Sequence, residues 1–178
     1  MVEKRSDPDD LIAMRSGDIY PSQELQKELS EKIFPRTPGE TIRRLSNVTG
    51  AFYGYTLKQA GLHYGWETID ALSRGLFHDL GSAKSREARD AGIDLPQDTR
   101  ALAIVIITAI FTSSPEYIFS TVTYRPQETA FRLKGTCRYY RIARNLNIEG
   151  HLTWPVLVPF FESVGHDCGF SSTIETTI

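Results

Sequence analysis

The spacing of apolar residues along the chain predicts helices for its first two thirds. Leu25, Leu29 and Ile33 repeat every four residues, and this stripe follows Pro21-Ser22 and stops at Phe34-Pro35. A proline placed after such a stripe ends a helix, because it lacks the backbone donor and clashes with the preceding turn. The pattern therefore predicts an amphipathic helix with one apolar face.

A longer helix is predicted next, because residues 37–40 (Thr-Pro-Gly-Glu) combine a capping box with proline at the first helical position. Apolar residues keep the helical period from Ile42 to Ala60. Three glycines lie within or at the end of this pattern, Gly50, Gly54 and Gly61. Each costs about 1 kcal/mol relative to alanine in a helix interior, so another helix or a ligand is expected close to the backbone there.

Residues 63–66 (His-Tyr-Gly-Trp) predict a break, and a further helix is predicted over residues 67–91. Its apolar face is predicted to contain Ile69, Leu72, Leu76, Phe77 and Leu80. Asp98 can cap another helix that runs to Thr112, although the β-branched residues of that segment leave a buried strand open as an alternative.

The last third predicts strands separated by short helices. Residues 117–124 and 128–134, joined by a turn, predict a hairpin with one buried face. A helix over residues 154–164, kinked by Pro159, and a final strand over residues 168–178 follow. The fold class is therefore predicted to be α+β, with an N-terminal helical layer packed on a small antiparallel sheet and short interrupting helices.

The length of 178 residues suits one domain with a hydrophobic core. We predict a single α+β domain over residues 21–178. Residues 1–20 are predicted to form an N-terminal arm that is flexible or drapes on the domain or a partner subunit, with a short helix over residues 9–15.

The composition argues against two classes of binding partner, nucleic acids and membranes. The net charge of −2 gives no basic field for nucleic acid, so nucleic-acid binding is not expected. The N-terminus lacks the apolar run of a signal peptide, and the longest mainly apolar run, residues 101–111, is too short to cross a membrane. We expect a cytoplasmic protein without membrane contact. A homodimer is left open.

Cofactor and metal signals are weak. The two cysteines, Cys137 and Cys168, allow one disulfide, but a reducing compartment favours free thiols. The four histidines lack metal-ligand spacing, and no glycine-rich loop joins a strand to a helix. The sequence therefore predicts neither a metal site nor a cofactor.

The segment over residues 134–145 gathers most of the reactive side chains on one short predicted helix. Thr136 is predicted as its N-cap, which would place Cys137 in the first turn, where free backbone N–H groups favour a thiolate. A row of arginines, Arg138, Arg141 and Arg144, could hold an anionic group. A half-buried structural cysteine beside a solvated basic face is the equally weighted alternative.

Three motifs give the chain a resemblance to the L-2-amino-thiazoline-4-carboxylic acid hydrolase-like family over about residues 40–178. They are residues 62–67 (Leu-His-Tyr-Gly-Trp-Glu), Cys137-Arg138-Tyr139 entering a short helix, and residues 165–170 (Gly-His-Asp-Cys-Gly-Phe). The family usually carries a further cysteine where this chain has residues 152–155 (Leu-Thr-Trp-Pro). The last motif is also similar to small-molecule-binding domains of the vinyl-reductase type, which need not be enzymes.

The resemblance implies a cofactor-independent hydrolase that opens a small heterocycle bearing a carboxylate. Cys137 would be the nucleophile, His166 the general acid or base with Asp167 near it, and Arg138 or Arg141 the carboxylate clamp.

Two other functions stay open. A cofactor-free cyclase or isomerase, such as a pericyclase, would fold an apolar secondary metabolite between aromatic walls. Its candidate wall residues are Tyr53, Trp66, Tyr139, Tyr140, Trp154 and Phe160. The third function is a ligand-binding module without turnover. In each case the expected partner is a small molecule, apolar or carboxylate-bearing.

Overall fold

The computed structural model describes residue 15, residues 17–114, residues 116–171 and residues 173–175. The chain forms two compact units, residues 1–45 and residues 46–178, and the boundary falls inside a helix. The predicted single domain over residues 21–178 stays a prediction. The predicted short helix over residues 9–15 lies outside the described residues except for Arg15.

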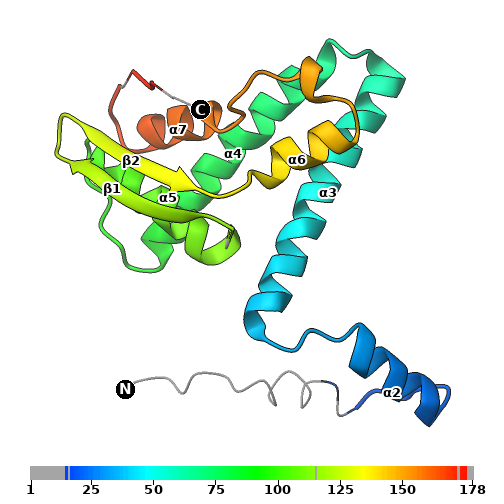
Figure 1. The fold of residues 1–178 in the computed structure, drawn as a ribbon. Helices are drawn as coiled ribbons and strands as arrows, with labels where there is room; N and C mark the ends of the chain where they lie inside the picture. Colours follow the sequence, from blue (N-terminus) through cyan, green and yellow to red (C-terminus); the bar gives the residue numbers. More distant parts are fainter. Residues whose placement is uncertain (1–14, 16, 115, 172, 176–178) are drawn as a thin grey trace, which may run out of the picture. The chain divides into compact units, whose positions relative to one another are not determined.

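The first unit contains helix α2, Gln23–Lys32, and the start of helix α3, Pro38–Tyr64 (Figure 1). Ser22 caps α2, since its Oγ accepts a hydrogen bond from the Leu25 N–H at 3.1 Å. Thr37 caps α3, since its Oγ1 accepts from the Glu40 N–H, also at 3.1 Å. Both predicted helix starts are confirmed. None of the residues of α2 is buried.

The second unit begins with the remainder of α3. Its buried residues are Ser46, Gly50, Gly54, Leu57 and Gly61. All of them except Leu57 are small. A Cβ at Gly54 would approach Ile142 closer than 3.0 Å, and a Cβ at Gly61 would approach Trp66 equally closely. Close packing against side chains therefore explains these two glycines.

Gly65 adopts a φ of 96° and ends α3, as predicted, because glycine takes the left-handed conformation at little cost. Helix α4, Thr68–Asp90, follows. It lies against helix α7, Val158–Asp167, as Figure 1 shows. A Cβ at Gly81 would come closer than 3.0 Å to the backbone carbonyl oxygen of Phe160, and the Ser82 and Ser163 hydroxyls are 2.7 Å apart.

The predicted apolar face of α4 is wrong in part. Leu72 and Leu76 are 45% and 48% exposed. Ile69 and Phe77 of the predicted face are buried, together with Ser73, Gly81, Ser85 and Ala88. Small residues allow the close approach of α7, and this approach, rather than side-chain hydrophobicity, selects which face of α4 is buried.

Helix α5, Arg100–Ser113, has the helical conformation preferred for this apolar segment. Strands β1, Ile118–Tyr124, and β2, Thr129–Lys134, form an antiparallel hairpin with a register irregularity between Thr121 and Thr123. Figure 1 shows this hairpin alongside α5. Phe119, Phe131 and Leu133 pack on the core, so the predicted buried face of the hairpin is confirmed.

The chain ends with helix α6, Arg138–Asn145, the 3₁₀ turn η1, Glu149–His151, and α7. Pro159 lies in the first turn of α7, where its missing N–H is not needed, so it begins this helix and does not kink it. Cys168 is the C-cap of α7, and the described residues after it are not in a strand. The predicted final strand is therefore wrong for those residues.

Two hydrophobic clusters form the core of the second unit. The larger joins α4, α5, α7 and the hairpin, and the smaller joins Leu57, Ile69, Ala143, Ile148 and Leu152. The fold is α+β, as predicted. Among the described residues, no helix combines the length and apolar character that crossing a membrane requires.

Candidate functional site

The hairpin delivers Cys137 and Arg138 beside the start of β1. Ile118 pairs with Lys134, so the residues just before β1 lie next to the residues just after β2. Gly135 is needed at this crossing, because a Cβ there would approach the Glu116 carbonyl oxygen closer than 3.0 Å. Glu116 and Tyr117 therefore become neighbours of the α6 N-terminus.

Cys137 is the N-cap residue of α6, and the prediction that Thr136 would hold this position is wrong. Gly135 and Thr136 are used to turn from the strand into the helix, which moves the start of α6 by one residue. The Cys137 thiol makes no capping hydrogen bond. It is free and only partly buried.

Arg138 is 3% exposed and lies within a dense polar cluster. Its Nη1 is 3.1 Å from Glu116 Oε1, and it donates hydrogen bonds to the Ser113 carbonyl oxygen at 2.6 Å and to Ser46 Oγ. Nη2 donates to Tyr139 Oη at 3.0 Å and to Ser114 Oγ at 3.3 Å. The guanidinium therefore joins α3, the end of α5 and the start of β1.

One donor of this guanidinium stays unused. Arg138 Nε is buried and has no hydrogen-bond acceptor among the described residues. A buried charged donor without an acceptor is unfavourable, and an acceptor atom of a ligand or a water molecule would relieve this cost.

The predicted row of three arginines is not formed. Arg138 points inward, and its aliphatic part packs on Gly50 of α3, where an added Cβ would be 3.4 Å from its carbons. Arg141 is exposed and donates to Asn47 Oδ1 at 2.6 Å. Arg144 is exposed.

Three aromatic rings pack together next to Cys137. Tyr53, Phe77 and Tyr139 form edge-to-face pairs with centroids 4.9 to 5.6 Å apart. The Tyr53 hydroxyl is 2.8 Å from Ser73 Oγ. Burial raises the pKa of Tyr53 to about 12, against the Ser73 hydrogen bond. Burial, followed by the nearby Cys137, raises the pKa of Tyr117 as well. Both phenols stay protonated at neutral pH and can donate hydrogen bonds.

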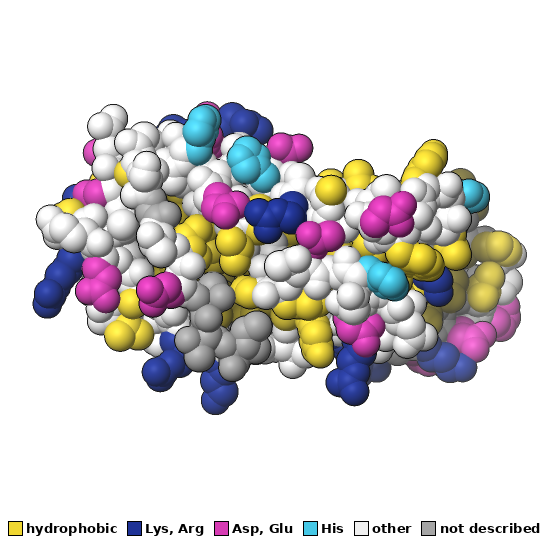
Figure 2. Space-filling model, turned by 90° about the horizontal axis from the view of Figure 1, so that it is seen from above, with side chains coloured by type: hydrophobic (Ala, Val, Ile, Leu, Met, Phe, Trp, Pro, Cys, Tyr) yellow, Lys and Arg dark blue, Asp and Glu magenta, His cyan; other side chains and the backbone are white. Residues whose placement is uncertain are grey.

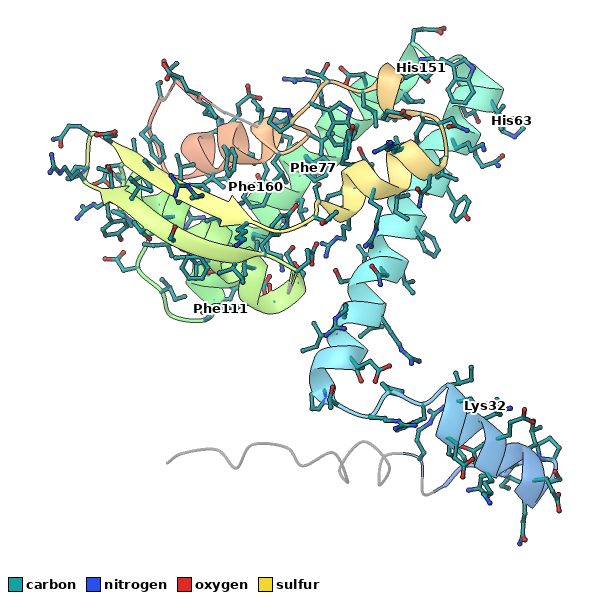
Figure 3. All side chains as sticks on the ribbon, viewed as in Figure 1. Lys32, His63, Phe77, Phe111, His151 and Phe160 are labelled. Carbon is teal, nitrogen blue, oxygen red and sulfur yellow. The ribbon has the colours of Figure 1, made fainter. Side chains whose placement is uncertain are left out.

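A small cavity of about 40 Å³ is lined in part by Tyr139 and Arg138. Its apolar wall includes Ile106, Ala109, Ile110 and Phe160, and Tyr117 and Lys84 also line it. Figure 3 shows Phe77 and Phe160 in the interior beside the hairpin. Because one water needs roughly 10–15 Å³ measured in this way, the cavity has room for about three water-sized groups.

The remaining predicted wall residues lie elsewhere. Tyr140 packs edge-to-face on Trp154, with centroids 5.0 Å apart, and Trp154 Nε1 donates to the Glu149 carbonyl oxygen at 3.0 Å. Trp66 stacks on His151, with ring centroids 4.9 Å apart. Both residues line a separate open depression, together with Glu67 and Asp70. Figure 3 shows His151 near the far end of α6 from the hairpin.

The predicted acid–base group is not brought to Cys137 by any described contact. The His166 side chain is 84% exposed at the end of α7, and its ring Nδ1 lies 3.5 Å from Asp167 Oδ1. Cys168 is buried, and burial raises the pKa of its thiol although Arg89 opposes this. Cys168 is therefore a protonated, structural thiol at neutral pH.

Sequence reasoning missed Glu116, Tyr117 and Lys84. Glu116 and Tyr117 could have been found from the sequence, since any hairpin over the two predicted strands places the residues at the start of β1 beside the segment that enters α6. Lys84 gave no such signal. It lies on α4, and its Nζ contacts Glu87 Oε2 at 2.6 Å and Thr112 Oγ1 at 2.7 Å.

Among the described residues, no three or more potential metal ligands are grouped closely enough to hold an ion. On the face shown in Figure 2, basic and acidic side chains are interspersed. Comparison with known proteins matched no protein-family model, no curated protein and no solved structure.

Proposed function

We propose that residues 46–178 form a small-molecule-binding domain whose ligand occupies the cavity beside Arg138 and Tyr139. The observation that carries this proposal is the buried Arg138 Nε, which lacks an acceptor among the described residues, in a side chain that lines the cavity. A pocket with apolar walls and few polar groups is the usual form of a ligand site.

The charges around the cavity favour a neutral ligand. Arg138 is already paired with Glu116, and Lys84 with Glu87, so a carboxylate would add an unbalanced buried charge. A carbonyl oxygen can accept from Arg138 Nε without this cost. The small volume limits the ligand to about three heavy atoms, such as the amide formamide.

The experiment is an NMR titration of the full chain with formamide and, as a probe without an acceptor, xenon. Both should shift the methyl resonances of Ile106 and Ile110 saturably, and only formamide should shift the Arg138 Nε–H resonance. Ala109→Leu fills the cavity and should abolish both effects. Ala71→Leu, at an exposed alanine of α4, is the matched control and should leave them unchanged. Shifts that persist in Ala109→Leu would place the ligand elsewhere.

A cysteine-dependent hydrolase is the second candidate, and the partly exposed Cys137 thiol next to Tyr117 supports it. Tyr117 could donate a proton to a leaving atom, although the described contacts bring no general base to the thiol. Alkylation measured across pH should modify Cys137 well before the buried Cys168. A Cys137 that reacts no faster than Cys168 would remove this candidate. The cyclase interpretation has less support, since the cavity is small for a folded secondary metabolite.

The free thiols of Cys137 and Cys168 suit a reducing compartment such as the cytoplasm, and we include that location in the proposal. The proposal also includes a homodimer.

A further inference from the structure

Helix α3 within the second unit has mostly small residues on its buried side and a row of large apolar residues on the opposite side. Its buried side is built of glycines, serine and Leu57, as described above. The opposite side, here called the α3 outer face, consists of Val48, Phe52, Tyr55, Gln59 and Leu62. Its four apolar residues are 56%, 74%, 58% and 58% exposed in that order. A helix that ended its packing at this surface would leave its most hydrophobic side in water, which is unfavourable.

The spacing of the α3 outer face is that of a coiled coil. The steps from Val48 to Leu62 are four, three, four and three residues, which is the alternation of the two core positions in a heptad. The stripe is about 21 Å long at 1.5 Å per residue. Such a stripe fits one partner helix laid along it.

The charge of this segment favours its own copy as the partner. Lys58 is the only lysine, arginine, aspartate or glutamate within residues 46–64. A face without charge does not repel a second copy, and it offers a nucleic acid or an acidic protein almost nothing to bind. The polar flank that a membrane-surface helix would need is occupied by packing inside the unit.

We infer that two copies of the chain pair antiparallel through the α3 outer face. Antiparallel pairing about the midpoint between Phe52 and Tyr55 places Phe52 of one copy against Tyr55 of the other, twice. It also places Val48 against Gln59, so each bulky residue meets an apolar or uncharged one. A parallel pairing would instead bring Lys58 next to His63 of the second copy, and the two basic groups would repel each other when His63 is protonated.

Sedimentation velocity on the full chain over a concentration series tests the interface. The wild-type chain of 20.1 kDa should sediment as a dimer, and Phe52→Glu should raise the dimer Kd by at least about tenfold, because it buries an unpaired carboxylate. Phe111→Glu is the matched control, since Phe111 is 72% exposed on α5 away from this face, and it should leave the Kd unchanged. Circular dichroism melts of both variants verify that they fold.

Oxidative cross-linking of mixed Val48→Cys and Gln59→Cys chains tests the orientation. The mixed disulfide should dominate, and wild-type protein controls for the native cysteines. A wild-type monomer at all concentrations, an equal effect of the two glutamate variants, or binding of the monomer to lipid vesicles through this face would overturn the interface. A Val48→Cys homodisulfide in place of the mixed product would overturn the antiparallel arrangement.

Discussion

Helices α3 and α4 both bury glycine, but the two glycine surfaces face different kinds of neighbour. Gly81 of α4 approaches the backbone of α7 at Phe160, whereas Gly54 of α3 approaches side-chain methyl groups, Cγ2 of Ile142 on α6 and Cδ1 of Leu146 at the C-cap of α6. A helix backbone can yield only by moving the whole helix. A side chain can yield by changing rotamer.

The same sequence signal, a glycine inside a helix, therefore marks two kinds of contact that differ in rigidity. In α4 it reports a rigid helix–helix contact, and in α3 it reports a contact that depends on a few side chains. The attachment of α3 to the rest of its unit then combines the apolar contacts of Leu57 and Tyr53 with polar anchors, above all Arg138. The contribution of the polar anchors can be tested by substitution.

The largest expected effect is at Arg138. Arg138→Met keeps much of the aliphatic packing on Gly50 but leaves Glu116 partly buried without its cation, so unfolding should cost about 3–5 kcal/mol less. Urea denaturation measures this difference. Arg141→Met is the matched control on α6, where a single exposed hydrogen bond to Asn47 is lost, and it should cost less than about 1 kcal/mol.

A double variant sharpens this result. Arg138→Met combined with Glu116→Gln removes both charges and should recover part of the loss. An Arg138→Met protein as stable as wild type would show that the Arg138 cluster does not contribute to the attachment of α3.

The glycine comparison predicts the next effect. Gly81→Ala should destabilise the protein by about 1–3 kcal/mol, because the new methyl meets a backbone oxygen. Gly54→Ala should cost less, since Ile142 can shift. Gly75→Ala, in α4 with open space around it, should stabilise by about 0.5–1 kcal/mol through helix propensity. Thermal melts of the three variants give the order, and a Gly54→Ala loss equal to that of Gly81→Ala would remove the distinction.

The smallest expected effect concerns the bond from Tyr53 of α3 to Ser73 of α4. Tyr53→Phe should cost about 1 kcal/mol at neutral pH, the usual contribution of one hydrogen bond. The folded chain holds the Tyr53 proton up to a pKa of about 12, whereas the unfolded chain loses it near the ordinary value of 10.0. Between these values the unfolded state binds fewer protons, so the free energy of unfolding falls as pH rises.

Tyr53→Phe should make this alkaline loss shallower. Tyr64→Phe, an exposed tyrosine on the same helix, should leave the pH profile as it is in the wild type. Denaturant titrations at several pH values compare the two variants. Identical alkaline profiles for Tyr53→Phe and the wild type would assign the loss to other groups, Tyr117 among them.

Periodicity and capping predicted most of the elements. The starts of α2 and α3, the break at Gly65, the helical state of α5 and the hairpin all follow from local residue chemistry. The buried face of α4 could not be predicted in this way, because the face that packs depends on how closely α7 approaches. Leu72 and Leu76 are apolar but lie on the exposed side of the helix. The final strand was predicted from β-branched residues, yet Cys168 is used to end α7.

The site was only partly within reach of sequence. Cys137, Arg138 and Tyr139 are adjacent in the chain, and the structure keeps them at one corner with Tyr53. His166 follows from a motif rather than from any spatial constraint, and the structure leaves it exposed on α7. Arg138 illustrates the limit most clearly, since its partners Ser46, Ser113 and Glu116 lie far away in the sequence and no local pattern predicts that they meet it.

The Arg138 cluster also bears on the order of folding. Its hydrogen bond to Ser46 closes a loop of 92 residues, which costs roughly 4 kcal/mol of chain entropy before any contact is gained. The hairpin that delivers Arg138 closes over only a few residues. We therefore expect the hairpin to form early, and the contacts of Arg138 with α3 to form only after the hairpin, α5 and α6 have assembled. A contact that forms this late contributes little to the folding rate and acts mainly by slowing the escape from the native state.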